Sequence, residues 1–445
     1  MSELAILGGK CIMPQDYPIP DNLFRWPIIT KEDEEAVLDV VRRNAFSGFD
    51  VTEKFEEEVC RWLGVKHAVG FTNGTMSLEA AMYAVGLGAG DEMICPTKTY
   101  WASALSAGRL GASVVFANIH PDNLTLDPRD LERCLSPKTK AIMVVHYLAY
   151  PADMDAIMAF AKKHNLKVLE DCSHAQGGYY KGKRLGTIGD VGAMSMMSGK
   201  SFAAGEMGML VTNNREMFER ALAYGHYDRY SLISDESPIK KYSGMPLGGI
   251  KGRVNQVSSA IGRVQLKYYE NRTREIRKAQ NHFFDCIDAA HLPGLYPIRC
   301  NEADGSTMAG WYVPGFIYRP KEIGGLDFRV FADAVSKEIK YRPWPGFNHP
   351  LHTHPIFQDF DLMNIGKPER IAFADRDVRE LDSALKPSEE VECLAAPWFK
   401  SYQPEIIEMF AEGFIKVIRN YGDLIEDKRK SDADTGRWYG MENKK

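Results

Sequence analysis

The sequence predicts an α/β fold, in which a mainly parallel sheet carries helices on both faces. Short apolar runs alternate with helix-periodic segments from about residue 51 to residue 210. Small turn residues, such as Asn73-Gly74 and Gly177-Gly178, bound these runs. The 445 residues suffice for two domains. We expect a large domain over residues 1–265, a smaller C-terminal α/β domain over 266–435 and a charged tail over 436–445.

The expected elements follow in chain order. Residues 1–30 are proline-rich and irregular, and Thr30 caps a helix over 31–43. A second helix covers 51–63, where apolar residues recur at helical spacing. Strands and helices then alternate. A long helix near 256–269 bridges to the second domain, which ends with a helix over 405–420.

Composition narrows the function classes. A net charge of −5 and ordinary hydrophobic content give no sign of a nucleic-acid or anionic-membrane partner. No signal peptide or membrane-spanning run is present in the sequence. The eight cysteines are scattered without a CxxC pair, which indicates reduced thiols. We therefore expect a soluble cytoplasmic protein.

Lys200 lies among small and apolar residues in the stretch Ser-Met-Met-Ser-Gly-Lys-Ser-Phe-Ala-Ala-Gly (195–205). Loss of water disfavours the ammonium form, so a lysine in such surroundings is suited to attack a carbonyl as a neutral amine. Taken alone, it is equally a solvent-exposed loop lysine.

Three upstream features fit a cofactor site around Lys200. Asp171 falls just past a short buried strand, where open α/β sheets bind ligands, although a helix cap or a surface charge has the same appearance. Gly74 and Thr75 open a helix whose N-terminus can hold a phosphate, or form an ordinary turn. Tyr100 and Trp101 offer a face for a planar ring, or belong to the core.

The combined pattern resembles the pyridoxal-phosphate sugar aminotransferases of the DegT/DnrJ/EryC1/StrS family. The match runs from about Pro27 to Leu266. The blocks that carry it, in order, are Asn-Gly-Thr-Met-Ser-Leu (73–78), Gly-Ala-Gly-Asp-Glu-Met-Ile-Cys-Pro (88–96), Thr-Tyr-Trp-Ala-Ser (99–103), Ala-Asp-Met-Asp-Ala-Ile (152–157), Leu-Glu-Asp-Cys-Ser-His-Ala-Gln-Gly (169–177), Gly-Thr-Ile-Gly-Asp-Val-Gly (186–192) and Gly-Glu-Met-Gly-Met (205–209). The resemblance implies fold type I of the pyridoxal-phosphate enzymes, with a seven-stranded sheet.

The resemblance also implies residue roles. Lys200 matches the lysine that forms a Schiff base with pyridoxal 5′-phosphate, and Asp171 matches the carboxylate that pairs with the pyridine nitrogen. His174 takes the place of a Gln or His beside the ring. Ser195 matches a serine that contacts the phosphate, together with Gly74 and Thr75, and Tyr100 matches an aromatic that stacks on the ring.

Two positions depart from the family pattern. Lys251 replaces an Asn that reaches the cofactor phosphate of the neighbouring subunit, and a lysine is still able to reach it as a point charge. Ala149 stands where a glycine is usual. Nearby Arg253 is a candidate for the donor carboxylate or an acidic group of the acceptor, or forms a structural salt bridge.

The segment Asn-His-Pro-Leu-His-Thr-His-Pro (348–355) holds three histidines. Without a Cys or carboxylate at a familiar spacing, we predict no metal site there. The family has a similar segment over its active site, and His352 matches its histidine, which implies contacts with substrate hydroxyl groups.

The resemblance implies an aminotransferase that acts as a homodimer on small molecules, with L-glutamine or L-glutamate as amino donor. Residues 4–10 and 24–27 look like the opening of the branch that aminates inososes, so we expect a cyclitol or keto-sugar acceptor. The alternative is a nucleotide-linked 3- or 4-keto-hexose. A cofactor-dependent sugar dehydratase and a non-catalytic regulator also remain open, although retention of Lys200 favours transamination.

Overall fold

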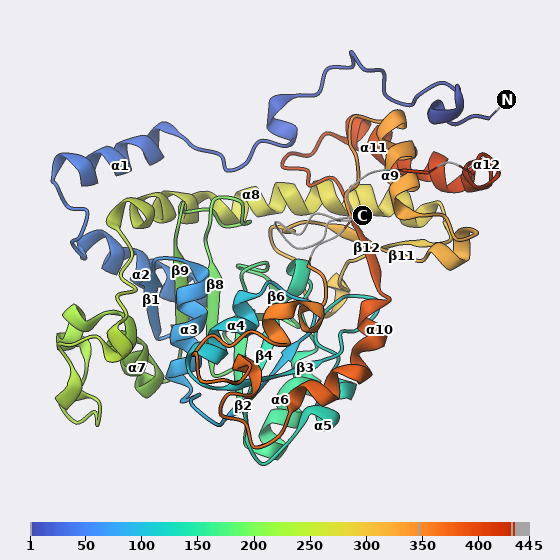
Figure 1. Ribbon diagram of the computed structural model, residues 1–445. Coiled ribbons are helices and arrows are strands. Elements are labelled where there is room, and N and C mark those ends of the chain that lie inside the picture. Colours follow the sequence, from blue (N-terminus) through green and yellow to red (C-terminus); the bar gives the residue numbers. More distant parts are fainter. Residues whose placement is uncertain (1, 346–347, 429, 432–445) are drawn as a thin grey trace.

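A seven-stranded sheet forms the centre of the molecule (Figure 1). The computed structural model describes residues 2–345, 348–428 and 430–431. The strands, in sheet order, are β1 (His67–Phe71), β9 (Gly208–Thr212), β8 (Val191–Ser195), β5 (Lys167–Asp171), β4 (Thr139–Val145), β2 (Glu92–Pro96) and β3 (Ser113–Ala117). β9 runs antiparallel to both neighbours, and the pairs from β8 to β3 are all parallel. The prediction of a mainly parallel sheet is confirmed.

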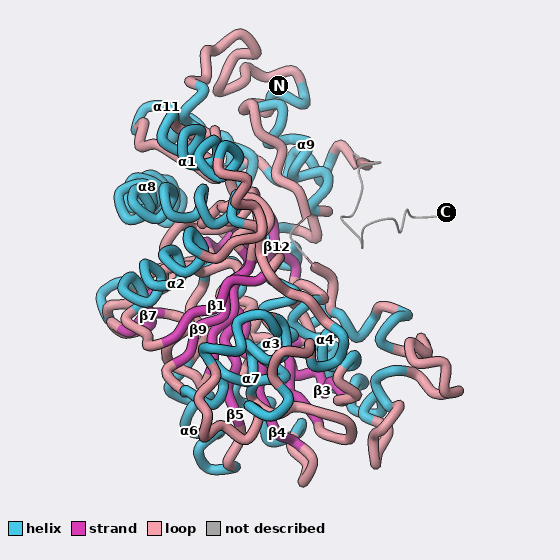
Figure 2. Tube along the Cα trace, turned by 90° about the vertical axis from the view of Figure 1, so that its left-hand side faces the viewer, coloured by secondary structure: helices cyan, strands magenta, loops and turns pink. Residues whose placement is uncertain are grey.

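Helices cover both faces of this sheet, because its strands are apolar on both sides. In β2, Met93 and Cys95 join a core with one set of helices, whereas Ile94 joins the core on the opposite face. The first set is α3 (Gly74–Ala84), α4 (Ala102–Arg109) and α7 (Arg215–Gly225); the second includes α2 (Asp50–Leu63), α5 (Leu131–Cys134) and α6 (Met154–His164). Figure 2 shows α2 and α3 on opposite sides of the strands.

A second, smaller sheet lies beside the first. Its antiparallel strands are β10 (Leu295–Pro297), β11 (Gly315–Tyr318) and β12 (Glu392–Ala395), and a two-stranded hairpin of β6 (Tyr179–Tyr180) and β7 (Lys183–Arg184) forms a third sheet. The helices of this half are α9 (Phe328–Glu338), α10 (Lys386–Glu389), α11 (Pro404–Arg419) and α12 (Tyr421–Glu426).

The bridging helix is much longer than predicted. α8 spans Gln256–Ala289 and crosses from one sheet to the other (Figure 1). The expected end near residue 269 is wrong, because buried residues continue at helical spacing through Ile276, Phe283 and Ile287. The proposed division at residue 265 therefore falls inside a helix, and the two-domain description remains a prediction.

The N-terminal helix begins at the predicted residue. α1 spans Lys31–Arg42, and Thr30 caps it with a reciprocal pair of hydrogen bonds to Asp33. Before it, the irregular segment reaches the second half of the chain, where Phe24 packs on Phe399. In the part of the chain that the structure describes, no helix is long and apolar enough to cross a membrane. The predicted charged tail lies outside the described residues.

Candidate active site

Several of the predicted site residues lie at the carboxyl edge of the sheet, where parallel strands leave room for ligands. Asp171 ends β5 and Ser195 ends β8, while Gly74 opens the helix that follows β1. Asp171 is the last residue of its strand, not a residue beyond it. The strand is thus one residue longer than predicted, and Asp171 still lies at the carboxyl edge of the sheet.

Lys200 is buried, so the exposed-loop interpretation is wrong. Its side chain is 9% exposed, and its Nζ lies 4.3 Å from the centroid of the Tyr312 ring. Burial lowers the pKa of Lys200 to about 8, although the nearby charge of Asp171 acts in the opposite direction. The backbone carbonyl of Lys200 accepts a hydrogen bond from Nε1 of Trp26, at 2.8 Å. At pH 7 about a tenth of this amine is therefore neutral, far more than for a lysine with its usual pKa.

Asp171 is fixed by two donors. Its Oδ2 accepts a hydrogen bond from Oγ of Ser103 at 2.7 Å, and its Oδ1 accepts one from the backbone N–H of Ser173 at 2.9 Å. The Ser103 hydroxyl also contacts Oγ1 of Thr99 at 3.0 Å. Sequence reasoning missed the role of Ser103, although the serine lies in the block that carries the family resemblance.

Gly74 and Ser195 are in direct contact. A Cβ atom at position 74 would lie 2.5 Å from Cβ of Ser195, so only glycine allows this approach. Asn73 caps the helix by accepting a hydrogen bond from Met76 N–H at 2.9 Å. Thr75 lies in the first turn of α3, a helix of 11 residues. The positive end of the helix dipole, the Ser195 hydroxyl and the Thr75 hydroxyl therefore share one small region.

His174 is a neutral imidazole in this site. Burial and the charge of Lys200 hold its pKa well below the usual value. Its Nδ1 accepts a hydrogen bond from the backbone N–H of Leu148 at 3.3 Å, which leaves the proton on Nε2. Leu148 and Ala149 both have positive φ angles, of 51° and 69°. This left-handed backbone explains why glycine suits position 149, the departure noted in the sequence.

Tyr100 and Lys251 are exposed, unlike the buried Lys200, Asp171 and His174. Tyr100 is 40% exposed and packs against Trp101, so the alternative that these rings belong to the core is wrong. Lys251 is exposed, with its Nζ 5.9 Å from the centroid of the Tyr227 ring. Arg253 forms an ion pair with Asp228, which is the structural alternative considered from the sequence.

His352 is buried, and both of its ring nitrogens have partners. Nδ1 lies 2.6 Å from Oγ1 of Thr97, and Nε2 lies 3.1 Å from a carboxylate oxygen of Glu389. The neighbouring His354 accepts a hydrogen bond from the backbone N–H of Ile356 at its Nδ1. His352 is thus held in place by side chains of this chain.

A different histidine belongs to a compact buried cluster. His146, Glu170 and Cys172 bring three possible ligand atoms within 4.8 Å of one another. Nε2 of His146 is 3.0 Å from Glu170, and its Nδ1 accepts a hydrogen bond from Ala152 N–H at 3.1 Å. Both nitrogens are therefore engaged in holding the loop that follows β4.

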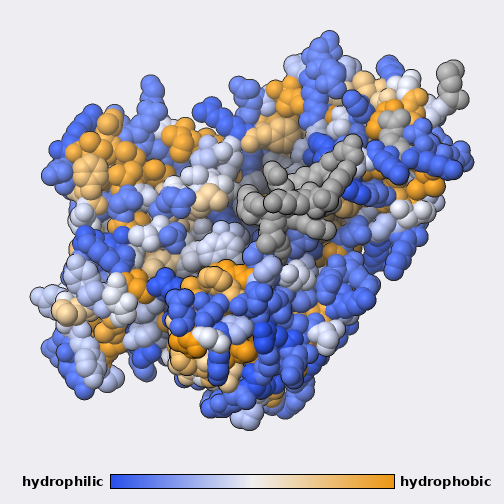
Figure 3. Space-filling view, in the orientation of Figure 1, coloured by the Kyte–Doolittle hydropathy of each residue, from blue (hydrophilic) through white to orange (hydrophobic). Residues whose placement is uncertain are grey.

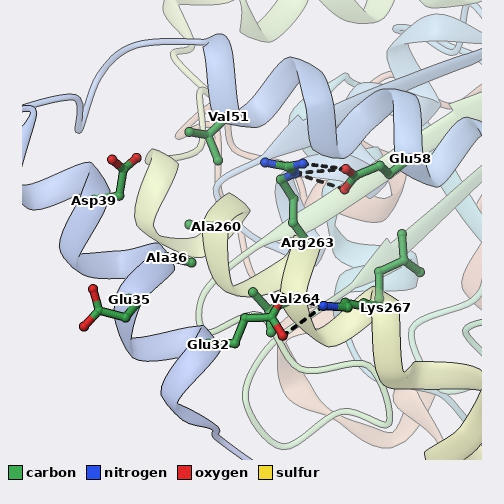
Figure 4. A pocket seen from close by; sticks show the side chains of 11 residues that line it. Glu32, Glu35, Ala36, Asp39, Val51, Glu58, Ala260, Arg263, Val264 and Lys267 are labelled. Carbon is green, nitrogen blue, oxygen red and sulfur yellow. Dashed lines mark hydrogen bonds and ion pairs between the residues drawn. The ribbon is translucent and has the colours of Figure 1, made fainter.

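A groove of about 570 Å³ lies between α1, α2 and α8 (Figure 4). The cations on its walls are paired: Arg263 with Glu58 at 2.7 Å, and Lys267 with Glu32 at 2.8 Å. None of the predicted site residues lines it. The chemistry therefore belongs to the edge of the sheet around Lys200.

The residues at that edge fit pyridoxal 5′-phosphate. A phosphate matches the glycine-lined helix N-terminus beside Ser195. An aldehyde matches the buried amine of Lys200, and a protonated ring nitrogen matches the fixed carboxylate of Asp171. The structure also adds Tyr312 and Trp26 to the site. No local sequence signal marks Tyr312, because its contact with Lys200 arises only in the folded chain.

Comparisons with known proteins agree with this chemistry. The family model for the DegT/DnrJ/EryC1/StrS aminotransferases matches residues 27–367. A relative from Micromonospora echinospora, named putative L-glutamine:3-amino-2,3-dideoxy-scyllo-inosose aminotransferase, is 34% identical over 95% of this chain and 98% of its own length. GDP-perosamine synthase from Caulobacter vibrioides is 32% identical over 68% of this chain and 78% of its own. The crystal structure of an aminotransferase from Psychrobacter cryohalolentis has a TM-score of 0.75 at 25% identity, covering 90% of this chain and all of that one.

The family match and these relatives account for the fold and for the class of reaction. The chain therefore belongs to the DegT/DnrJ/EryC1/StrS aminotransferase family and is an aminotransferase that uses pyridoxal 5′-phosphate.

Proposed function

We propose that this enzyme moves an amino group from L-glutamine or L-glutamate to the ketone of a cyclitol or keto sugar. The observation that carries the proposal is the buried amine of Lys200, with its lowered pKa, next to the fixed carboxylate of Asp171. Such an amine is suited to form a covalent link to an aldehyde and then, once released, to move a proton.

The cyclitol acceptor is supported by the extent of the match. The relative named for an amino-dideoxy-inosose aligns with 95% of the chain, including part of the irregular N-terminal segment. The relative named GDP-perosamine synthase aligns with 68%. The second candidate acceptor, a nucleotide-linked keto-hexose, is supported by that relative and by the nearby cationic side chain of Lys251.

Each residue has a distinct task in the proposed reaction. Bound pyridoxal 5′-phosphate supplies an electron sink. Asp171 keeps a proton on the ring nitrogen, and Gly74, Thr75 and Ser195 bind the phosphate. Lys200 would take the proton from the α-carbon of the donor, as general base, and deliver it to the C4′ carbon of the cofactor, as general acid. Tyr100 and His174 enclose the ring, and His352, whose ring nitrogens contact Thr97 and Glu389, positions these side chains for the acceptor.

We assign Arg253 a positioning task, since its guanidinium is already paired with Asp228.

Lys251 is proposed to reach the phosphate in a neighbouring subunit, which requires a homodimer. Exposed apolar side chains support a subunit contact at the end of the molecule that carries α1 and α7 (Figures 1 and 3): Leu38, Val41, Phe46, Tyr230, Tyr242 and Met245. None of the eight cysteines forms a disulfide, which supports a cytoplasmic location.

The decisive experiment is the absorption spectrum of the purified enzyme before and after addition of L-glutamine or L-glutamate. Loss of the band of the lysine-bound cofactor establishes the first half of the reaction, and inososes can then be screened as acceptors. A cofactor band that neither donor changes points to a dehydratase or a regulator.

Lys200→Ala tests the assignment of the lysine. The variant is expected to remain folded, because removal of the buried amine also removes the cost of burying its charge. It should lose covalent attachment of the cofactor, measured by mass after borohydride reduction. A reduced cofactor adduct on the variant would show that another amine forms the link.

A further inference from the structure

Lys400 is enclosed by two indole rings that come from distant parts of the chain. It lies between β12 and α11, is 5% exposed, and donates its backbone N–H to the carbonyl of Leu23 at 2.7 Å. Its Nζ lies 2.6 Å from the centroid of the Trp398 ring and 4.8 Å from that of Trp26. The N-terminal segment and the C-terminal half together therefore form the surroundings of one amine.

Three lysines are buried among the described residues, and Lys400 is the one whose side chain has neither a hydrogen-bond partner nor an assigned task. Lys98 donates to the carbonyl of Val391 at 3.1 Å, and Lys200 is the proposed cofactor lysine. Nζ of Lys400 has no hydrogen-bond partner among the residues the structure describes. Indole faces attract a cation, but they do not provide the acceptors that three N–H donors need. Burial holds the pKa of Lys400 well below its usual value. Among the described residues, the ammonium form of Lys400 thus has no anionic partner.

The rings that enclose Lys400 also belong to the active site. Trp26 donates its indole N–H to the backbone carbonyl of Lys200. Trp398 packs edge-on against Tyr312, with 5.5 Å between ring centroids, and Tyr312 contacts Nζ of Lys200. Burial does not exclude a ligand from Lys400, because Lys200 is almost equally buried at 9% exposure and is the group that substrates must reach.

We propose that Lys400 binds the α-carboxylate of the amino donor, an inference that rests on the proposed function. An amino-acid donor carries this anion next to the carbon that loses the amino group, whereas a cyclitol or keto-sugar acceptor has none. A single enclosed cation suits one carboxylate better than the larger diphosphate of a nucleotide sugar. Arg253 is already paired with Asp228, whereas Nζ of Lys400 has no hydrogen-bond partner among the described residues and can take up a proton when it pairs with an anion. Lys400 therefore serves the donor half of the reaction.

The test compares Lys400→Met with Lys278→Met. Lys278 is a matched control, since its Nζ also lies over an aromatic ring, 3.8 Å from the centroid of Tyr402, but on the exposed surface. Donor binding to the holoenzyme is followed by tryptophan fluorescence, because Trp26 and Trp398 flank the proposed site. Both L-glutamine and its α-carboxamide are titrated. Lys400→Met should weaken L-glutamine binding by about 10- to 100-fold, the loss typical of a hydrogen bond to a charged group.

Further outcomes separate this proposal from the one on which it rests. The variant should lose the preference for carboxylate over carboxamide, with no change in the half-saturating acceptor concentration, and Lys400→Arg should restore part of that preference. Unchanged L-glutamine binding in Lys400→Met, with only a shifted thermal midpoint, would make the lysine structural and overturn the inference. Lys400-dependent binding without any loss of the cofactor band would instead overturn the aminotransfer and leave the carboxylate site standing.

Discussion

At the scale of the residue, the charge state of Lys200 decides when the amine can react. Its pKa of about 8 lies below the value of about 10.4 expected in an unfolded chain. The rate at which the cofactor-free protein captures pyridoxal 5′-phosphate should therefore rise about tenfold per pH unit below pH 8 and level off above it. Stopped-flow absorbance between pH 6 and 10 measures this profile. A rate that keeps rising to pH 10 would mean an unperturbed lysine.

The same pKa shift changes stability with pH, in a direction that can be worked out. Between about pH 8 and 10.4 the unfolded chain holds a proton on Lys200 that the folded chain has lost. The unfolded state then binds more protons, so the free energy of unfolding contributed by this group rises with pH across that window. Urea titrations of the cofactor-free protein and of Lys200→Met should differ in slope there.

Single residues differ in how far the sequence identifies them. Lys200, Asp171 and Gly74 were found because their types and spacing are tied to one chemistry, and they converge in the structure. Trp26, Tyr312 and Lys400 were not found, because their meaning depends on contacts between segments far apart in the chain. A lysine two residues after Trp398 has no special signature in the sequence, because its second ring, Trp26, comes from the other end of the chain.

At the scale of the element, the end of β5 depends on Glu170. Its two carboxylate oxygens accept hydrogen bonds from the backbone N–H groups of Gly186, Ile188 and Gly189 at 2.6–2.8 Å, and pair with His146. Glu170→Gln replaces one acceptor oxygen by a donor group within this fully buried network. We expect a loss of about 3 kcal/mol in the free energy of unfolding, measured by urea denaturation.

Glu270→Gln, on α8, provides the matched control for Glu170→Gln. Glu270 also accepts two hydrogen bonds, from Trp62 and Arg184, but its side chain is 52% exposed. Solvent screens the ion pair between Glu270 and Arg184, so Glu270→Gln should lower the free energy of unfolding by less than about 1 kcal/mol. If the two variants lost the same free energy of unfolding, the buried hydrogen bonds of Glu170 would not be what stabilises the end of β5.

Element ends were less predictable than element types. The helix that begins at Lys31 was placed correctly, because its Thr30 cap is a local signal. The end of α8 was not, although the basic run 272–278 is partly the solvated face of a continuing helix. Arg277 pairs there with Glu302, while Ile276 is buried on the other side. Which face of a helix is covered depends on the tertiary structure.

At the scale of the whole molecule, two distant regions complete one site. The sheet edge supplies Asp171, Ser195 and Lys200, while the second half of the chain supplies Tyr312 and Trp398. The irregular N-terminal segment joins them through Trp26, which contacts both Lys200 and Lys400. The α/β alternation predicts the sheet, but it cannot predict this closure, since the first 30 residues have no periodic pattern.

The proposed homodimer gives the last prediction. Val41 and Met245 are 46% and 72% exposed at the end of the molecule that carries α1 and α7, and such apolar surface is better buried in a subunit contact (Figure 1). The wild type should sediment at twice the chain mass of 50.1 kDa. The double variant Val41→Asp/Met245→Asp should sediment as single chains and retain less cofactor, because Lys251 of one subunit then no longer reaches the phosphate of the other. The control is Ile425→Asp, 39% exposed on α12 at the opposite end, which should remain a dimer. Dissociation in the control, or a dimeric double variant, would place the contact elsewhere.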